Sequence, residues 1–226
     1  MKDPLVSRNR CDSSGRAFAG SQRQIQHYVN ESPQVLEEAI SDALGFPLQV
    51  EWVSPLRSDR YREYKDSSFL QALGLYESRA ELRCFWPGGG PVWDALGIVR
   101  DANNGVVLLE AKSHVAEILG NGCGATAHSS LNKIEVSLGA TKRWLGVCEG
   151  ADWKGKRYQT ANRLAHLYFF REILHRDAWL VNVYFTDDPH SRTSIAQWDT
   201  AVSDVKKSLG ISRIPFYADV YLPAIC

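Results

Sequence analysis

The chain has 226 residues, with 26 basic and 26 acidic side chains and a formal net charge of zero. An apolar fraction of 44% and seven tryptophans supply enough large side chains for a packed core, which excludes a globally disordered chain. Neutrality argues against a duplex-DNA binder that depends on a general basic surplus, but it leaves room for a local basic patch.

Residues 1–20 are polar and rich in Ser, Gly and Arg, and we expect a loose leader ahead of a single domain over 21–226. The leader has no apolar stretch typical of a signal peptide, and no apolar run approaches the roughly 18 residues of a membrane span. The five cysteines are odd in number, widely spaced and without a CxxC pair, which favours reduced thiols. We therefore expect a cytoplasmic protein without a membrane partner.

The first clear helix is predicted over 32–45, with Ser32 as its cap, Pro33 at the first helical position and Gly45 after its end. A strand is predicted over 47–56 and a short helix from about Asp66 to Leu73. These elements lead into the most informative part of the sequence.

Three strands are predicted in series, over 80–86, 92–99 and 106–112. The first two are separated by the turn sequence PGGGP, and the last two by RDANNG, which carries an Asn-Gly hairpin signal. Because both connections are short, we expect the three strands to form an antiparallel meander.

The second half alternates helices and strands. A Gly-rich loop at 120–128 precedes predicted helices over 129–146 and 158–174, a buried strand over 177–185, a helix over 194–210 capped by Ser194, and a final strand over 216–222. This order predicts an α/β fold with a mixed central sheet.

Three ionisable residues stand at strand ends in this pattern. Glu110 and Lys112 are two residues apart and therefore share one face of their strand. If the loop before that strand has five residues, Asp94 lies opposite Glu110, with the two side chains about 5 Å apart. Two adjacent carboxylates favour a divalent cation such as Mg²⁺ or Mn²⁺, and the carbonyl of Ala111 could add a ligand. Lys112 would orient or activate a metal-bound water, an arrangement suited to phosphodiester hydrolysis.

The pattern VWDALG…VVLLEAK, within roughly residues 81–112, resembles the PD-(D/E)XK, or restriction-endonuclease-like, nuclease superfamily. The resemblance implies an αβββαβ core with N- and C-terminal additions, metal binding by Asp94 and Glu110, and assistance to the nucleophile by Lys112. It implies a metal-dependent nuclease with nucleic acid, DNA first, as its partner. One departure is Trp93, which stands where the family has proline. The alternatives are a non-catalytic nucleic-acid- or protein-binding module on the same fold, and an unrelated α/β protein.

Many members of that superfamily take a further acid from a helix before the first strand. The candidates here are Glu38, Glu63 and Asp66. Chain order favours Glu63 or Asp66, whereas Glu38 lies on the better-formed helix, so the sequence leaves the three open.

The helix over 158–174 carries a polar stripe at positions i, i+3, i+4 and i+7, namely Gln159, Asn162, Arg163 and His166. Together with Lys154, Lys156 and Arg157, these residues form the best local candidate for contacts with a substrate phosphate. The alternative is a solvated helix face. The remaining His and Cys candidates, His114, Cys123 and His128, match no standard zinc spacing.

Overall fold

The structure is a computed structural model that describes residues 10–100 and 104–225. Its α-helices and β-strands are α1 Gly20–Glu31, α2 Pro33–Leu44, β1 Val50–Ser54, β2 Tyr64–Lys65, α3 Asp66–Ala72, α4 Arg79–Phe85, β3 Val92–Trp93, β4 Ala95–Val99, β5 Gly105–Lys112, α5 His128–Trp144, α6 Tyr158–Tyr168, β6 Ala178–Thr186, α7 Ile195–Leu209 and β7 Tyr217–Pro223. Short 3₁₀ turns cover Arg57–Asp59, Tyr76–Ser78 and Val115–Ile118, and a π-helical turn, Phe169–Ile173, extends α6.

Five strands form one mixed sheet in the order β1-β4-β5-β6-β7. The pairs β1/β4 and β4/β5 are antiparallel, whereas β5/β6 and β6/β7 are parallel. The central strands β5 and β6 are buried almost throughout, as their continuous apolar runs require of strands covered on both faces. The predicted α/β class with a mixed sheet is confirmed.

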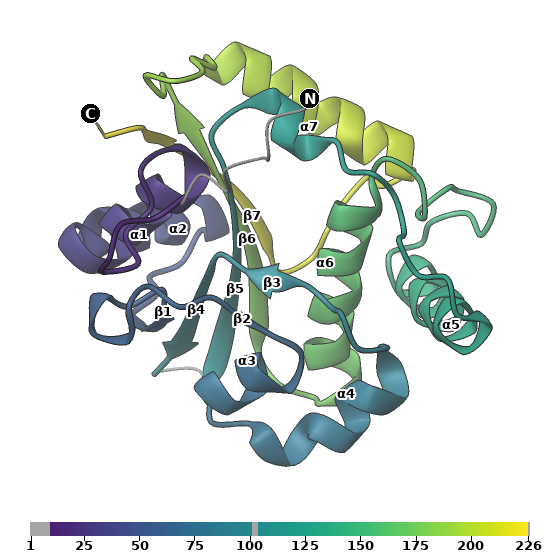
Figure 1. Ribbon diagram of the computed structural model, residues 1–226. Helices are drawn as coiled ribbons and strands as arrows, with labels where there is room; N and C mark the ends of the chain where they lie inside the picture. Colours follow the sequence, from purple (N-terminus) through teal and green to yellow (C-terminus); the bar gives the residue numbers. More distant parts are fainter. Residues whose placement is uncertain (1–9, 101–103, 226) are drawn as a thin grey trace, which may run out of the picture.

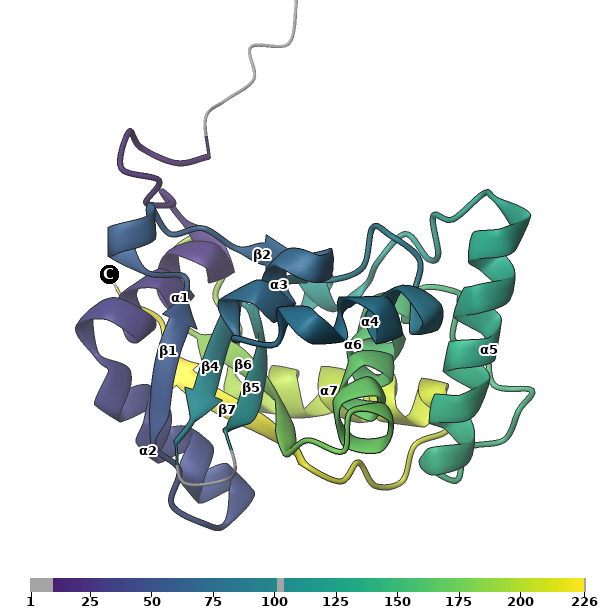
Figure 2. The same cartoon turned by 90° about the horizontal axis from the view of Figure 1, so that it is seen from below.

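Helices cover both faces of the sheet (Figure 1). Helices α1 and α2 lie against one face, whereas α3, α4, α6 and α7 lie on the other, with α5 outside α6 (Figures 1 and 2). Along β5, Val107 and Leu109 join the core beneath α1 and α2, and Val106 and Leu108 join the core beneath α6. Because side chains alternate along a strand, Glu110 faces α6.

The strand predicted over 80–86 is wrong, because this segment is helix α4. Leu82, Phe85 and Trp86 are buried, and their spacing of three and four residues fits one face of a helix. The predicted meander of three consecutive strands is therefore wrong in its first strand, and only the antiparallel pair β4/β5 remains of it. The other antiparallel neighbour of β4 is β1, from the segment predicted as a strand over 47–56, and β2, α3, α4 and β3 lie between the two in the chain. A separation of four residues, as between Leu82 and Trp86, puts two side chains on the same side of either a strand or a helix. The sequence pattern therefore fits both elements, and the packed structure contains the helix.

The other predicted elements are present with local differences. Pro33 begins α2 and Gly45 ends it in the left-handed conformation, but the Ser32 side chain makes no capping hydrogen bond. Ser194 does cap α7, accepting a hydrogen bond from the amide of Gln197. In the predicted leader, residues 1–9 lie outside the described residues, whereas Ala17 is buried against α1. The hairpin loop prediction also falls partly outside them, at 101–103.

No helix within 10–100 and 104–225 is both long enough and apolar enough to cross a membrane.

Candidate active site

Two strand ladders bring three acidic residues into one row. The β4/β5 ladder ends at the pair Ala95 and Leu109, and the next residue on each side is Asp94 and Glu110. Asp94 lies just outside the ladder, and its hydrogen bond to the Ala111 amide keeps it at this end of β5. The β2/β3 ladder pairs Tyr64 with Trp93, and one further step places Glu63 opposite Asp94. The positions 100–104 between β4 and β5 make the five-residue connection that the Asp94–Glu110 prediction required.

Asp94 lies where the short strand β3 passes into β4. Its Oδ2 accepts a hydrogen bond of 2.7 Å from the backbone amide of Ala111, which ties it to the end of β5. Burial and the neighbouring charge of Glu110 raise the pKa of Asp94 to about 8. Within the described part of the chain, Oδ1 accepts no hydrogen bond and remains available to a ligand.

Glu110 is only 4% exposed and is surrounded by donors. Its Oε1 accepts from Lys112 Nζ at 2.5 Å and from Gln159 Nε2 at 2.7 Å. Its Oε2 accepts from Arg163 Nε at 2.6 Å. Burial opposes ionisation, but Arg163 and Lys112 outweigh it and hold the pKa of Glu110 below its ordinary value.

Lys112 shares the face of Glu110, as its spacing predicted. Burial disfavours its charge, but Glu110 and Asp94 more than compensate and raise the pKa of Lys112. The ammonium group therefore stays charged at neutral pH, beside both carboxylates.

Arg163 comes from α6, which crosses over the end of β5. Besides Glu110, it donates to the carbonyl of Val92 at 2.9 Å and lies 5.0 Å from the centre of the Trp93 ring. Arg163, Asn162 and His166 are all buried, so the solvated-face interpretation of the α6 stripe is wrong for these residues. Arg163 and Gln159 reach Glu110 on the sheet, whereas His166 packs against aromatic rings of α3, α4 and the segment 86–93. The spacing of the stripe did not show which of these neighbours each side chain would meet.

The three candidates for a further acid separate clearly. Burial raises the pKa of Glu63, and the nearby charge of Glu110 raises it further. The charge of Glu63 in turn contributes to the raised pKa of Asp94. Asp66 instead accepts from the amides of Gly89 and Gly90, at 3.0 and 2.9 Å, and so holds the PGGGP turn. Glu38 is exposed on α2, across the sheet from α6.

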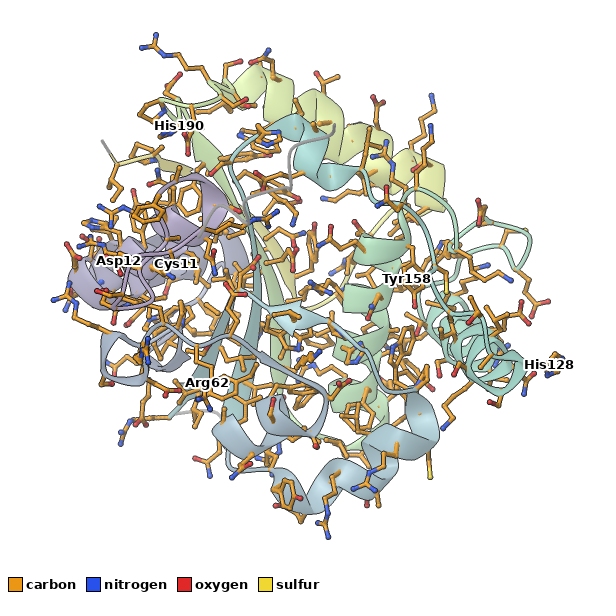
Figure 3. All side chains as sticks on the ribbon, viewed as in Figure 1. Cys11, Asp12, Arg62, His128, Tyr158 and His190 are labelled. Atoms are coloured by element: carbon orange, nitrogen blue, oxygen red, sulfur yellow. The ribbon has the colours of Figure 1, made fainter. Side chains whose placement is uncertain are left out.

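The remaining polar candidates are more scattered. Lys156 is exposed and Arg157 is half-buried in the turn before α6, whose first residue, Tyr158, is labelled in Figure 3. Neither the Lys156 nor the Arg157 side chain has a hydrogen bond or ion pair with other described residues. Lys154 pairs with Glu135. Oδ1 of the buried Asn162 has no partner within the described chain.

A second polar network, not predicted from the sequence, lies beside the first. Asn182 pairs with Glu110 across β5/β6 and with Asp219 across β6/β7. Asn182 donates to the Tyr217 hydroxyl at 2.6 Å, Tyr217 donates to Asp219 at 2.6 Å, and Lys206 donates to Asp219 at 2.6 Å. The signal in the sequence was a single Asn within the apolar run DAWLVNVYF.

A cavity of about 30 Å³ separates the two networks, which is room for about two water molecules. Its polar lining includes Glu110, Gln159, Arg163, Asn182, Lys206 and Tyr217.

Comparisons with protein-family models, curated proteins and solved structures found no match. Among the residues described, no group of three or more His, Cys, Asp or Glu side chains is placed to hold a metal ion. His114 pairs instead with Glu117 at 3.1 Å, and His128 is exposed on α5 (Figure 3). What the site offers is a pair of neighbouring carboxylates, a nearby third acid, one buried cation, Arg163, and one half-buried cation, Lys112.

Proposed function

We propose that the protein is a metal-dependent nuclease that hydrolyses phosphodiester bonds in nucleic acid, with DNA as the first substrate to test. The proposal rests on one observation, the placement of Asp94, between β3 and β4, against the end of β5 that carries Glu110 and Lys112. This is the arrangement that the resemblance to the PD-(D/E)XK superfamily implies. The series α2, β1, β4, β5, α6 and β6 also agrees with an αβββαβ core.

The donor set suits Mg²⁺ or Mn²⁺. Carboxylate and carbonyl oxygens are the ligands that these hard cations prefer, and Mg²⁺ commonly uses one or two carboxylates and keeps several waters. Asp94, Glu110 and the Ala111 carbonyl would hold the ion, with Glu63 next to them. Burial and, after it, the charge of Glu110 raise the pKa of Asp94, and a bound cation would favour the charged form against both effects. When bound, the ion would supply an activated water and polarise the phosphate.

The protein side chains have distinct roles in this proposal. Lys112 stays charged and would orient the attacking water or stabilise the negative charge that develops on the phosphate. Gln159, Asn162 and Arg163 on α6 would position the scissile phosphate. Lys156 and Arg157, in the turn before α6, would contact neighbouring phosphates of the strand.

The test is cleavage of single- and double-stranded DNA and RNA with Mg²⁺ or Mn²⁺. We expect metal-dependent cleavage by the wild type, and its loss in Asp94→Asn and Lys112→Ala. Glu38→Gln is the matched control, because Glu38 is an exposed acid on the other side of the sheet. Equal activity in the wild type, Asp94→Asn and Lys112→Ala would refute the assignment.

A second candidate is a non-catalytic nucleic-acid- or protein-binding module on the same fold. It is favoured by the complete engagement of Glu110, whose two oxygens already accept from Lys112, Gln159 and Arg163. Calorimetric titration with Mn²⁺ separates the two candidates. The nuclease should give binding heat that disappears in Asp94→Asn, and the binding module should give none that depends on Asp94.

A further inference from the structure

Both carboxylate oxygens of Glu110 already accept hydrogen bonds from protein side chains. Arg163 places both Nε and Nη2 at 2.6 Å from Oε2, and Lys112 and Gln159 occupy Oε1. Arg163 is 6% exposed and Glu110 is 4% exposed, so this ion pair is screened little by water. Arg163 therefore supplies positive charge where the proposed function places that of a metal ion.

A divalent cation cannot bind Glu110 while Arg163 stays in its present position. Both need Oε2 or the space beside it, and like charges at contact distance inside a protein repel strongly. The guanidinium has a second set of partners outside the acid row, the carbonyl of Val92 and the face of Trp93. Trp93 is fully buried and Val92 is 41% exposed, so these partners hold the guanidinium just below the surface. Arg163 also lines the cavity that Glu110 and Lys112 line, and a ligand in that cavity would reach it.

We infer that Arg163 exchanges partners, from Glu110 in the arrangement described above to a phosphodiester anion when metal and substrate bind. This inference rests on the proposed function and deepens it. A phosphodiester group that takes Arg163 frees Glu110 for the metal, and a metal that takes Glu110 frees Arg163 for the phosphate. Divalent cation and phosphodiester therefore bind with positive cooperativity, and by linkage each raises the affinity of the other by the same factor.

The first experiment is calorimetric titration of the wild type and of Arg163→Met with Mn²⁺ alone. We expect Arg163→Met to bind Mn²⁺ about tenfold more tightly, within the usual range of coupling between sites, because the competing cation is gone. Arg143→Met, which removes an exposed arginine of α5, is the matched control and should leave Mn²⁺ affinity unchanged. Equal or weaker binding by a folded Arg163→Met would overturn the inference.

The second experiment uses dimethyl phosphate as an inert phosphodiester anion and trimethyl phosphate as its neutral counterpart. Dimethyl phosphate should tighten Mn²⁺ binding to the wild type but not to Arg163→Met, and trimethyl phosphate should affect neither. An equal effect of dimethyl phosphate on both proteins would overturn the exchange.

A third measurement guards against loss of folding in Arg163→Met. In arginine-labelled wild type, the Arg163 Nε–H resonance, identified by its absence from the milder variant Arg163→Gln, should move on addition of Mg²⁺. A resonance that stays in place while Mg²⁺ binds would overturn the exchange. If Mn²⁺ binds and the binding needs Asp94, but Arg163 has no influence, the exchange fails and the proposed metal site survives. If no binding depends on Asp94, the proposed function fails first.

Discussion

His166 gives the sharpest test of how the core beneath the site is held. Its ring is 1% exposed and lies 5.1 Å from Trp86 and 6.0 Å from Trp93, ring centre to ring centre. Burial, with a smaller contribution from the charge of Arg163, lowers the pKa of His166 to about 3 from an ordinary 6.5. His166 is therefore neutral in the folded protein but takes up a proton in the unfolded chain as the pH falls below about 6.5.

The sign and size of the effect follow from linkage. Because the folded pKa is depressed, the contribution of His166 is fully present above the unfolded pKa and is lost as the pH falls from about 6.5 towards about 3. The unfolded state binds more protons in this window, so stability decreases with acidification. Between about pH 8 and about pH 5, the loss from this residue amounts to roughly 2 kcal/mol.

The assay is urea unfolding of the wild type and His166→Phe across that pH range. We expect the wild type to lose about 2 kcal/mol more unfolding free energy than His166→Phe between about pH 8 and about pH 5, whatever the offset between the two proteins at high pH. His128→Phe is the control, because His128 is exposed at the start of α5 (Figure 3) and should leave the pH dependence unchanged. Parallel pH profiles for the wild type and His166→Phe would refute the reasoning.

Two further predictions concern the carboxylates and one the sheet. Glu110→Gln should lower the free energy of unfolding by about 3–5 kcal/mol, because it leaves the buried Arg163 and the partly buried Lys112 without their partner. Asp94→Asn should raise the free energy of unfolding by about 1 kcal/mol or more, because it removes a carboxylate held against its charged form. Denaturant unfolding without metal measures both, and a loss of stability in Asp94→Asn would contradict the effects of burial and charge described for Asp94. Gly97→Ala should cost about 1–3 kcal/mol, because a Cβ there would clash with Val50 Cγ1. Gly124→Ala, with open space around it, should cost far less in the same assay. A similar cost at both glycines would contradict the close packing of β1 on β4.

The opposite signs expected for the two carboxylates bear on function. A buried group that weakens the folded state is a candidate for a functional role, and a ligand that neutralises its charge restores the lost stability. Asp94 fits that description and Glu110 does not, because Lys112 and Arg163 already satisfy Glu110. If Mn²⁺ binds as proposed, it should therefore stabilise the wild type against heat more than it stabilises Asp94→Asn.

The sequence by itself determined much of the local architecture, since alternation, apolar runs and turn residues act over a few positions. The spacing of Glu110 and Lys112 placed them on one face, and the five-residue connection placed Asp94 at the end of β5 that carries Glu110. The segment 80–86 was predicted wrongly, because a short apolar pattern fits both a strand and a helix until a partner surface selects one.

Only the tertiary structure decided which distant residues complete the site. The pairing of β2 with β3 selected Glu63 from three candidate acids, and the docking of α6 on the sheet turned Arg163 inward onto Glu110. These contacts join positions separated by tens of residues, and their geometry depends on how whole elements pack. Local sequence patterns indicate which residues share one face of a strand or helix, but they carry no direct information on how whole elements pack together.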